Sequence, residues 1–263
     1  MMTSEFLLKL ESLNNEYAEL VIATLVDLKG SAPQERGAKI IVGPDGLLYG
    51  TVGGGKVEKK VIEHAQTLFS QKNLTDFQSW NLQTDIGMTC GGVCSFYFEK
   101  WRTKPLWQVA IFGAGHVAQE VVRLLVRLEC SVICIDPRVE WLEKLPSHPH
   151  LKKIHSIEMK NEVANLSTDT FIACMTMGHA FDLPILEEVF KNGQFPFIGA
   201  IGSESKARTL KQDLLKLGFP PQLIETLNCP IGESFGNNTP PEIAISIVSQ
   251  LIIVRDRLKN LDL

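Results

Sequence analysis

Residues 108–138, QVAIFGAGHVAQEVVRLLVRLECSVICIDPR, decide the fold. An apolar run leads into the glycine turn 113–118, a helix-like run follows, and a second apolar run ends on Asp136. This order of strand, glycine turn, helix, strand and acid is typical of a nucleotide-binding βαβ unit. The segment therefore predicts two parallel strands joined by a helix.

The turn and the acid have distinct expected roles. Gly113 and Gly115 let the backbone turn sharply and approach a phosphate. The amides that open the helix, at His116 and Val117, would then hold that phosphate. The carboxylate of Asp136 lies about 20 residues further on, where it would accept hydrogen bonds from ribose hydroxyls.

Arg138 adds a guanidinium two residues after that acid, which favours a ligand with an extra phosphate. The alternative is a Rossmann-like domain whose crevice serves packing alone. The strand-like runs 171–176 and 195–202 alternate with helix-like runs, which predicts a doubly wound parallel sheet.

Two further strand ends carry polar residues. Gly202, Ser203 and Lys206 in GAIGSESK predict a second anion site, with a serine N-cap beside a solvated lysine as the alternative. His179 and Asp182 follow the strand before it, where α/β proteins place residues that face a ligand. An ordinary surface histidine is the alternative there.

The segment KWRTKPLW (100–107) is the best domain boundary, because its proline interrupts a short polar connection. We therefore expect domains 1–104 and 105–263. In the first, two strands flank a GPDG turn (43–46), and a glycine-led helix and a further strand follow. The expected fold class is α/β, with a C-terminal Rossmann-like doubly wound parallel sheet and a smaller N-terminal mixed α/β domain.

Composition excludes several function classes. A net charge of −4 without a basic stripe gives no footprint for nucleic acid. We find no apolar run of the ~20 residues that a membrane span needs, so a cytoplasmic protein is expected. Among the six cysteines there is no C-x-x-C pair. Four of them fall in apolar strand-like runs and are expected to be packed in the core: Cys94, Cys130, Cys134 and Cys174.

Three glycine-rich loops in the first domain carry the remaining candidates: GSAPQERGAK (30–39), GTVGGGKVE (50–58) and GMTCGG (87–92). Gly53, Gly54 and Gly55 would expose consecutive amides just before a helix and form an anion nest, or else serve a tight turn. Cys90 lies in the third loop. Bare amides around it would favour the thiolate, and absent side chains would let a bulky ligand reach the sulfur.

Together with IDPR (135–138), GAIGSESK (199–206) and CPIGESFGNNTPPEIA (229–244), these loops resemble the XdhC/CoxI family, the accessory factors of xanthine dehydrogenase and related molybdenum hydroxylases. The resemblance runs over nearly the whole chain in the same order. It implies a non-catalytic factor that binds molybdenum cofactor, protects it while a cysteine desulfurase installs sulfur, and delivers it to the hydroxylase large subunit. A homodimer is also expected.

The resemblance also assigns residues. Cys90 matches the cysteine of the family's C-G-G loop and becomes the expected cofactor contact and metal ligand, with Gly91 and Gly92 beside it. Gly53, Gly54, Gly55 and Glu58 match the G-G-G-x-x-E loop. The turn 113–118 would hold either the phosphate of molybdopterin, with or without its nucleotide, or NAD(P).

Two other functions stay open at the level of sequence. One is an NAD(P)-dependent oxidoreductase in which His116 or His179 acts as acid or base. The other is a sulfurtransferase that carries a persulfide on Cys90. We also expect one ligand site shared between the domains, with sulfur chemistry at Cys90 and the phosphate at the turn 113–118.

Overall fold

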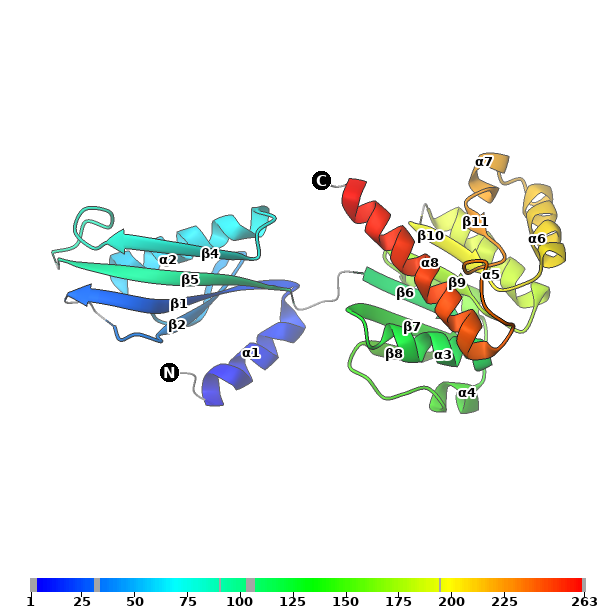
Figure 1. The fold of residues 1–263 in the computed structure, drawn as a ribbon, viewed down its shortest axis with the longest axis horizontal. Coiled ribbons are helices and arrows are strands. Elements are labelled where there is room, and N and C mark those ends of the chain that lie inside the picture. The colour runs from blue at the N-terminus through cyan, green and yellow to red at the C-terminus, as the bar shows by residue number, and fades with distance from the viewer. Residues whose placement is uncertain (1–3, 31–33, 90, 103–106, 194, 262–263) are drawn as a thin grey trace. The chain divides into compact units, whose positions relative to one another are not determined.

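The computed structural model describes residues 4–30, 34–89, 91–102, 107–193 and 195–261. The chain forms two compact units, Met1–Lys104 and Pro105–Leu263, each of which is described by itself (Figure 1).

The first unit is built on a five-stranded antiparallel sheet of order β3-β2-β1-β5-β4. The expected hairpin at residues 43–46 joins β2 to β3, with Gly43 opposite Gly46. The elements run in the order α1 (Ser4–Glu16), β1 (Glu19–Gly30), β2 (Lys39–Gly43), β3 (Gly46–Gly50), α2 (Gly55–Thr67), a 3₁₀ turn (Leu68–Ser70), β4 (Thr75–Asn81) and β5 (Gly92–Arg102).

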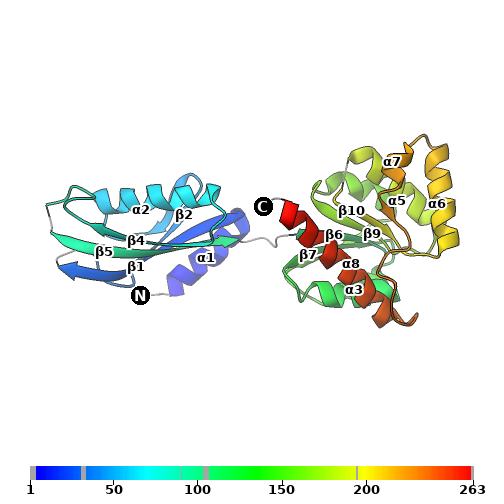
Figure 2. The ribbon, with the colours of Figure 1, turned by 45° about the horizontal axis from the view of Figure 1, so that its top comes forward.

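Two helices cover opposite faces of this sheet, as Figure 2 shows. Val57 and Val61 of α2 pack in one buried cluster with Phe96. Phe6 of α1 belongs to another, with Leu20 of β1. Because side chains alternate across a strand, β1 contributes to both clusters. The glycine loops lie at the ends of these strands, and Val52 of the second loop belongs to the cluster beneath α2.

The second unit contains a six-stranded parallel sheet of order β11-β10-β9-β6-β7-β8. This confirms the expected fold class. The elements are β6 (Trp107–Phe112), α3 (His116–Leu125), β7 (Cys130–Asp136), α4 (Val139–Glu143), β8 (Leu151–His155), a 3₁₀ segment (Met159–Asn165), β9 (Thr170–Cys174), α5 (His179–Asn192), β10 (Phe197–Ala200), α6 (Glu204–Lys216), α7 (Pro221–Ile224), β11 (Leu227–Asn228) and α8 (Pro240–Leu261).

Strand order reverses at β6, which pairs with β7 on one side and with β9 on the other. Helices α3 and α8 pack in one buried cluster, and α5 and α6 in another (Figure 2). In sheets of this kind the crevice at the carboxyl ends, next to the reversal, is where ligands bind. The ends of β6, β7 and β9 are therefore the region to inspect.

The four cysteines expected in the core are buried: Cys94, Cys130, Cys134 and Cys174. Burial raises the pKa of the Cys130 and Cys134 thiols to about 12. It also raises the pKa of Cys94. A buried thiol whose pKa lies this high is unreactive at neutral pH. These residues fill the core, as expected.

In the part of the chain that the structure describes, no helix has both the length and the apolar character required to cross a bilayer.

Candidate functional site

The first and third glycine loops touch at one end of the first sheet. Gly30, at the end of β1, is paired with Gly92, at the start of β5. Gly30 has a φ of +83°, and a Cβ there would lie 2.8 Å from the carbonyl oxygen of Gly91. Only glycine allows this approach. The glycine at position 30 therefore lets the two backbones meet.

A lysine joins the second loop to the third. The ammonium of Lys56, in the first turn of α2, donates a hydrogen bond to the Gly87 carbonyl oxygen at 2.6 Å. The structure thus brings all three glycine loops together at one end of the unit. Cys90 itself lies outside the described residues, while Gly87 and Gly91, which flank it in sequence, are described and exposed. Lys56 was not a candidate in the sequence analysis.

The Gly53–Gly55 turn is open on the side where side chains would stand. All three residues have positive φ, +135°, +66° and +53°, which confirms the need for glycine. A Cβ on Gly54 or Gly55 would meet nothing within 4 Å. Helix α2 begins at Gly55, and the first amides of a helix have no acceptor within the helix. Such an end attracts anions.

Glu58 braces this turn from inside the helix. Its Oε2 accepts a hydrogen bond from the Thr51 hydroxyl at 2.6 Å and one from the Val52 amide at 3.3 Å. The residue was expected to contact a cofactor. That contact stays a prediction, and in the structure one of the Glu58 oxygens fixes the backbone that leads into the glycines.

In the second unit, the turn 113–118 contains two glycines, and they occupy different structural environments. Gly113 has a φ of +104°, and a Cβ there would lie 2.3 Å from the Met175 carbonyl oxygen. The fold itself requires this glycine. Gly115 is the N-cap of α3 with φ −66° and ψ −177°, which suits any residue, and a Cβ there would meet nothing within 4 Å. Its glycine leaves bare backbone at the helix start.

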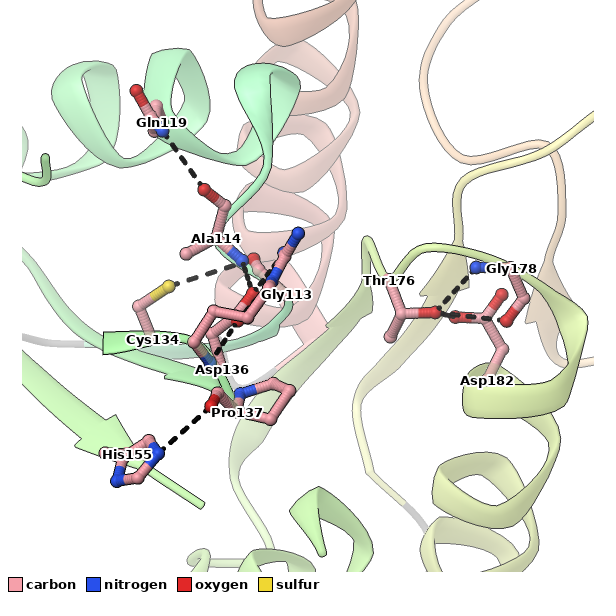
Figure 3. A network of polar contacts seen from close by, with 11 residues as sticks. Gly113, Ala114, Gln119, Cys134, Asp136, Pro137, His155, Thr176, Gly178 and Asp182 are labelled. Atoms are coloured by element: carbon pink, nitrogen blue, oxygen red, sulfur yellow. Dashed lines mark hydrogen bonds and ion pairs between the residues drawn. The ribbon is translucent and has the colours of Figure 1, made fainter. Parts of the chain in front are cut away.

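Asp136 is buried, with 1% of its surface exposed, and its carboxylate is saturated with donors. Oδ2 accepts from the Ala114 amide at 2.6 Å and from Nη2 of Arg138 at 2.8 Å. Oδ1 accepts from the backbone amide and Nε of Arg138, at 2.8 and 2.9 Å. Figure 3 shows the bond to Ala114. A ribose hydroxyl would have to displace one of these donors, which weighs against the expected ribose contact and leaves it a prediction.

Burial by itself raises the pKa of the Asp136 carboxyl, but the hydrogen bonds from Arg138 and Ala114 outweigh it and hold the pKa below the ordinary 3.8. We expect Asp136→Asn to lower the free energy of unfolding at neutral pH by about 2 kcal/mol, because charge-assisted bonds are lost. A carboxyl whose pKa is lower in the folded state than in the unfolded state stabilises the fold at pH values above the unfolded-state pKa. This stabilisation is lost as the pH falls through the folded-state pKa. Urea unfolding should therefore show the two proteins converging below pH 3.8, whereas a constant difference would contradict this.

The residues expected to form a second anion site are used within the fold. The Lys206 ammonium pairs with the fully buried Asp182 and donates to the Ile201 carbonyl oxygen at 2.7 Å. Ser203 is the N-cap of α6 and accepts from the Lys206 amide. A Cβ on Gly202 would lie 2.6 Å from Cδ of Lys206. The serine cap is confirmed, and Lys206 is neither a solvated lysine nor a ready phosphate ligand.

The other two polar residues at these strand ends join the same helices. The Asp182 carboxylate also accepts from the Thr176 hydroxyl at 2.6 Å, a contact drawn in Figure 3. Nε2 of His179 lies 3.0 Å from Oδ2 of Asp213 in α6. Both side chains therefore link α5 to its neighbours. Among the described residues, no three His, Cys, Asp or Glu side chains gather to hold a metal ion.

Comparisons with known proteins agree with this architecture. Residues 109–251, more than half of the chain, match the model of the XdhC Rossmann domain, and residues 15–78 match that of the XdhC and CoxI family. A solved structure named as a xanthine dehydrogenase from Bacillus halodurans has a TM-score of 0.51 at 20% identity, over 94% of this chain and 95% of that one. At this identity it supports the fold.

Three curated relatives match nearly the whole chain. The uncharacterised protein YqeB of Escherichia coli is 28% identical over 94% of this chain, which spans 45% of YqeB's length. A protein of Bacillus subtilis that is named as a probable xanthine dehydrogenase subunit is 22% identical over 95% of this chain and 97% of its own. The molybdenum cofactor insertion chaperone PaoD of Escherichia coli is 21% identical over 89% and 83%. As its glycine loops predict, the chain belongs to the XdhC and CoxI family.

Proposed function

We propose that this chain is an accessory factor that binds molybdenum cofactor as cargo for a hydroxylase of the xanthine dehydrogenase type. The observation that carries the proposal is the meeting of three glycine loops, one of which contains Cys90 in its sequence, through the Gly30–Gly91 and Lys56–Gly87 contacts. Support also comes from the relatives named as a molybdenum cofactor insertion chaperone and as part of a xanthine dehydrogenase.

The chemistry of these loops fits the cargo. Gly54 and Gly55 leave open backbone at the start of α2, where anionic groups of the cofactor would be attracted. The thiolate of Cys90 is a soft ligand of the kind that a transition metal accepts. In this proposal Cys90 contacts the metal end, and the bare backbone of the three loops makes room for the bulky ring system.

The proposal extends to the handling of the cargo. The chain holds the cofactor while a cysteine desulfurase installs its sulfur, and then passes it to the hydroxylase large subunit. It acts in the cytoplasm as a homodimer, and as a carrier rather than as a catalyst. An NAD-dependent oxidoreductase is the weaker candidate, since the Asp136 carboxylate that would select NAD is already saturated.

Metal and pterin content test the proposal. The full chain is purified from cells that make molybdopterin and from cells that are blocked in its synthesis. We expect molybdenum, by mass spectrometry, and fluorescent oxidised pterin only in the first preparation. If protein from the producing cells carries neither, the proposal is wrong.

The lysine between the loops provides a sharper prediction. Lys56→Met should lower the retained pterin about tenfold, on the scale of lost supporting contacts around a metal, because the Gly87 loop loses its tie to α2. The melting temperature should change little, since both groups are exposed. Lys59→Met on the same helix is the control, because Lys59 forms only a long pair with Glu63 at 3.9 Å. Equal pterin content in the two variants would show that the tie is irrelevant.

A further inference from the structure

Three side chains that carry or can carry positive charge gather around one indole in the second unit. The Arg138 guanidinium lies 4.8 Å from the centre of the Trp141 ring, and the Lys144 ammonium lies 4.1 Å from it. The His116 ring approaches the same indole edge-on at 4.9 Å. His116 is the first residue of α3, directly after the open backbone of Gly115. We call His116, Arg138, Trp141 and Lys144 the Trp141 cluster.

At this edge of the sheet the Asp136 carboxylate already accepts several hydrogen bonds, whereas the Arg138 guanidinium still has donors for a ligand. Asp136 holds Arg138 by Nε and Nη2, and the indole lies against the guanidinium, so the group is fixed in place. Within the described residues, Nη1 of Arg138 has no hydrogen-bond partner. Its pKa is raised first by the bond to Asp136 and to a lesser degree by the nearby Glu140. A rigid guanidinium with free donors suits a phosphate, whereas a ribose diol needs an acceptor.

A groove continues from Arg138 along the carboxyl edge. Its narrow part is lined by Gly113, Arg138, Met159, Thr176, Met177 and Phe181. Beyond Met159 and Phe181 it widens to a hollow of about 210 Å³ against Ile157 and Pro184. Three large apolar side chains of this groove are exposed, namely Ile157 at 70%, Met177 at 58% and Phe181 at 43%. Glu158 and Lys160 also line the hollow, so it offers a flat ring both apolar walls and polar groups.

We propose that the second unit binds a purine nucleotide that carries a phosphate on its ribose. The ribose phosphate is bound by the Trp141 cluster, and the base lies in the hollow against Phe181, because the narrow part beside Met177 has no room for a ring. This site goes beyond the cargo function, because it contains no part of the glycine loops of the first unit. Of the two sequence expectations at this strand end, the proposal keeps the extra phosphate at Arg138 and gives up the ribose contact at Asp136.

Two isomeric ligands test the site without any molybdenum cofactor. Calorimetry on the full chain compares 2′,5′-ADP with 5′-ADP, which have the same number of phosphates in different places. We expect 2′,5′-ADP to bind at least about tenfold more tightly, a difference of about 1.4 kcal/mol. Equal affinities, a preference for 5′-ADP, or binding of neither would overturn the proposal. The cargo proposal would survive that failure, because pterin content is measured separately.

Two variants test the phosphate contact and the base contact separately. Lys144→Gln should reduce the preference for 2′,5′-ADP and leave the affinity for 5′-ADP unchanged. Phe181→Ala should weaken both ligands about tenfold, the scale of one base stacked on an aromatic ring. Phe77→Ala, at an exposed phenylalanine of the first unit, is the matched control and should change neither. If Phe181→Ala behaves like Phe77→Ala, the base does not lie in the groove.

Discussion

Cys90→Ser is expected to leave the chain folded and to lower its retained molybdenum by about 100-fold or more, since changes in the supporting shell of a metal alone cost 10- to 100-fold. A hydroxyl is a hard, weakly acidic group that replaces a soft thiolate poorly as a metal ligand. The buried cluster between α2 and the sheet, which includes Cys94, Phe96 and Phe98, keeps all of these side chains in this variant.

Metal analysis of the two proteins, purified side by side, measures this effect. Cys229→Ser is the control, because that thiol lies half-buried in the second unit and burial raises its pKa. It should retain molybdenum as the wild type does. Undiminished molybdenum in Cys90→Ser would contradict the assignment of the thiol.

Gly113→Ala is expected to destabilise the second unit by roughly 2–6 kcal/mol. About 1–3 kcal/mol arises from a side chain at a φ of +104°, and a similar amount from overpacking against the Met175 carbonyl, 2.3 Å from the new Cβ. Met175 cannot easily retreat, because its amide donates to the Phe112 carbonyl oxygen at 2.7 Å.

Gly115→Ala, two residues away in the same turn, is the matched comparison. It should cost no more than about 1 kcal/mol, the usual penalty for alanine at an N-cap, because the space around it is open. Its effect should fall on nucleotide affinity. Urea unfolding measures the two stabilities, and a similar loss in both variants would refute the distinction between them.

In the second unit, the sequence was sufficient to predict those features that depend on a local pattern of residues. The glycine turn, the helix after it and the acid at the end of β7 are local features, and in the structure the Ala114 amide of the turn donates to the Asp136 carboxylate. What the acid does there depends on Arg138, whose side chain folds back onto it. A sequence pattern does not reveal which partner saturates a carboxylate.

The expected second anion site stays a prediction, and a non-local contact weighs against it. Lys206 follows a strand end with glycine and serine, as a phosphate ligand often does. Its ammonium instead pairs with Asp182, which lies on another helix and is fully buried. A buried carboxylate needs such a partner. Only the packing of α5 beside α6 shows that the two charges meet.

In the first unit, the glycine content predicted three loops of bare backbone, and the structure shows two of them in contact through Gly30 and Gly91. The tie through Lys56 could not be read from sequence, since nothing distinguishes this lysine from Lys59 or Lys60 on the same helix. The ligand site shared by Cys90 and the turn 113–118 stays a prediction. So does the role of Cys90, which lies outside the described residues.

Transfer of the cargo tests the central claim most directly. The full chain, purified from cells that make molybdopterin, is mixed with a hydroxylase of the xanthine dehydrogenase type that was produced without its cofactor. Hydroxylase activity and pterin content are then measured after the two proteins are separated. We predict that activity appears as pterin leaves the chain and that Cys90→Ser protein restores none. An inactive hydroxylase beside a chain that keeps its pterin, or equal activation by Cys90→Ser, would contradict the account.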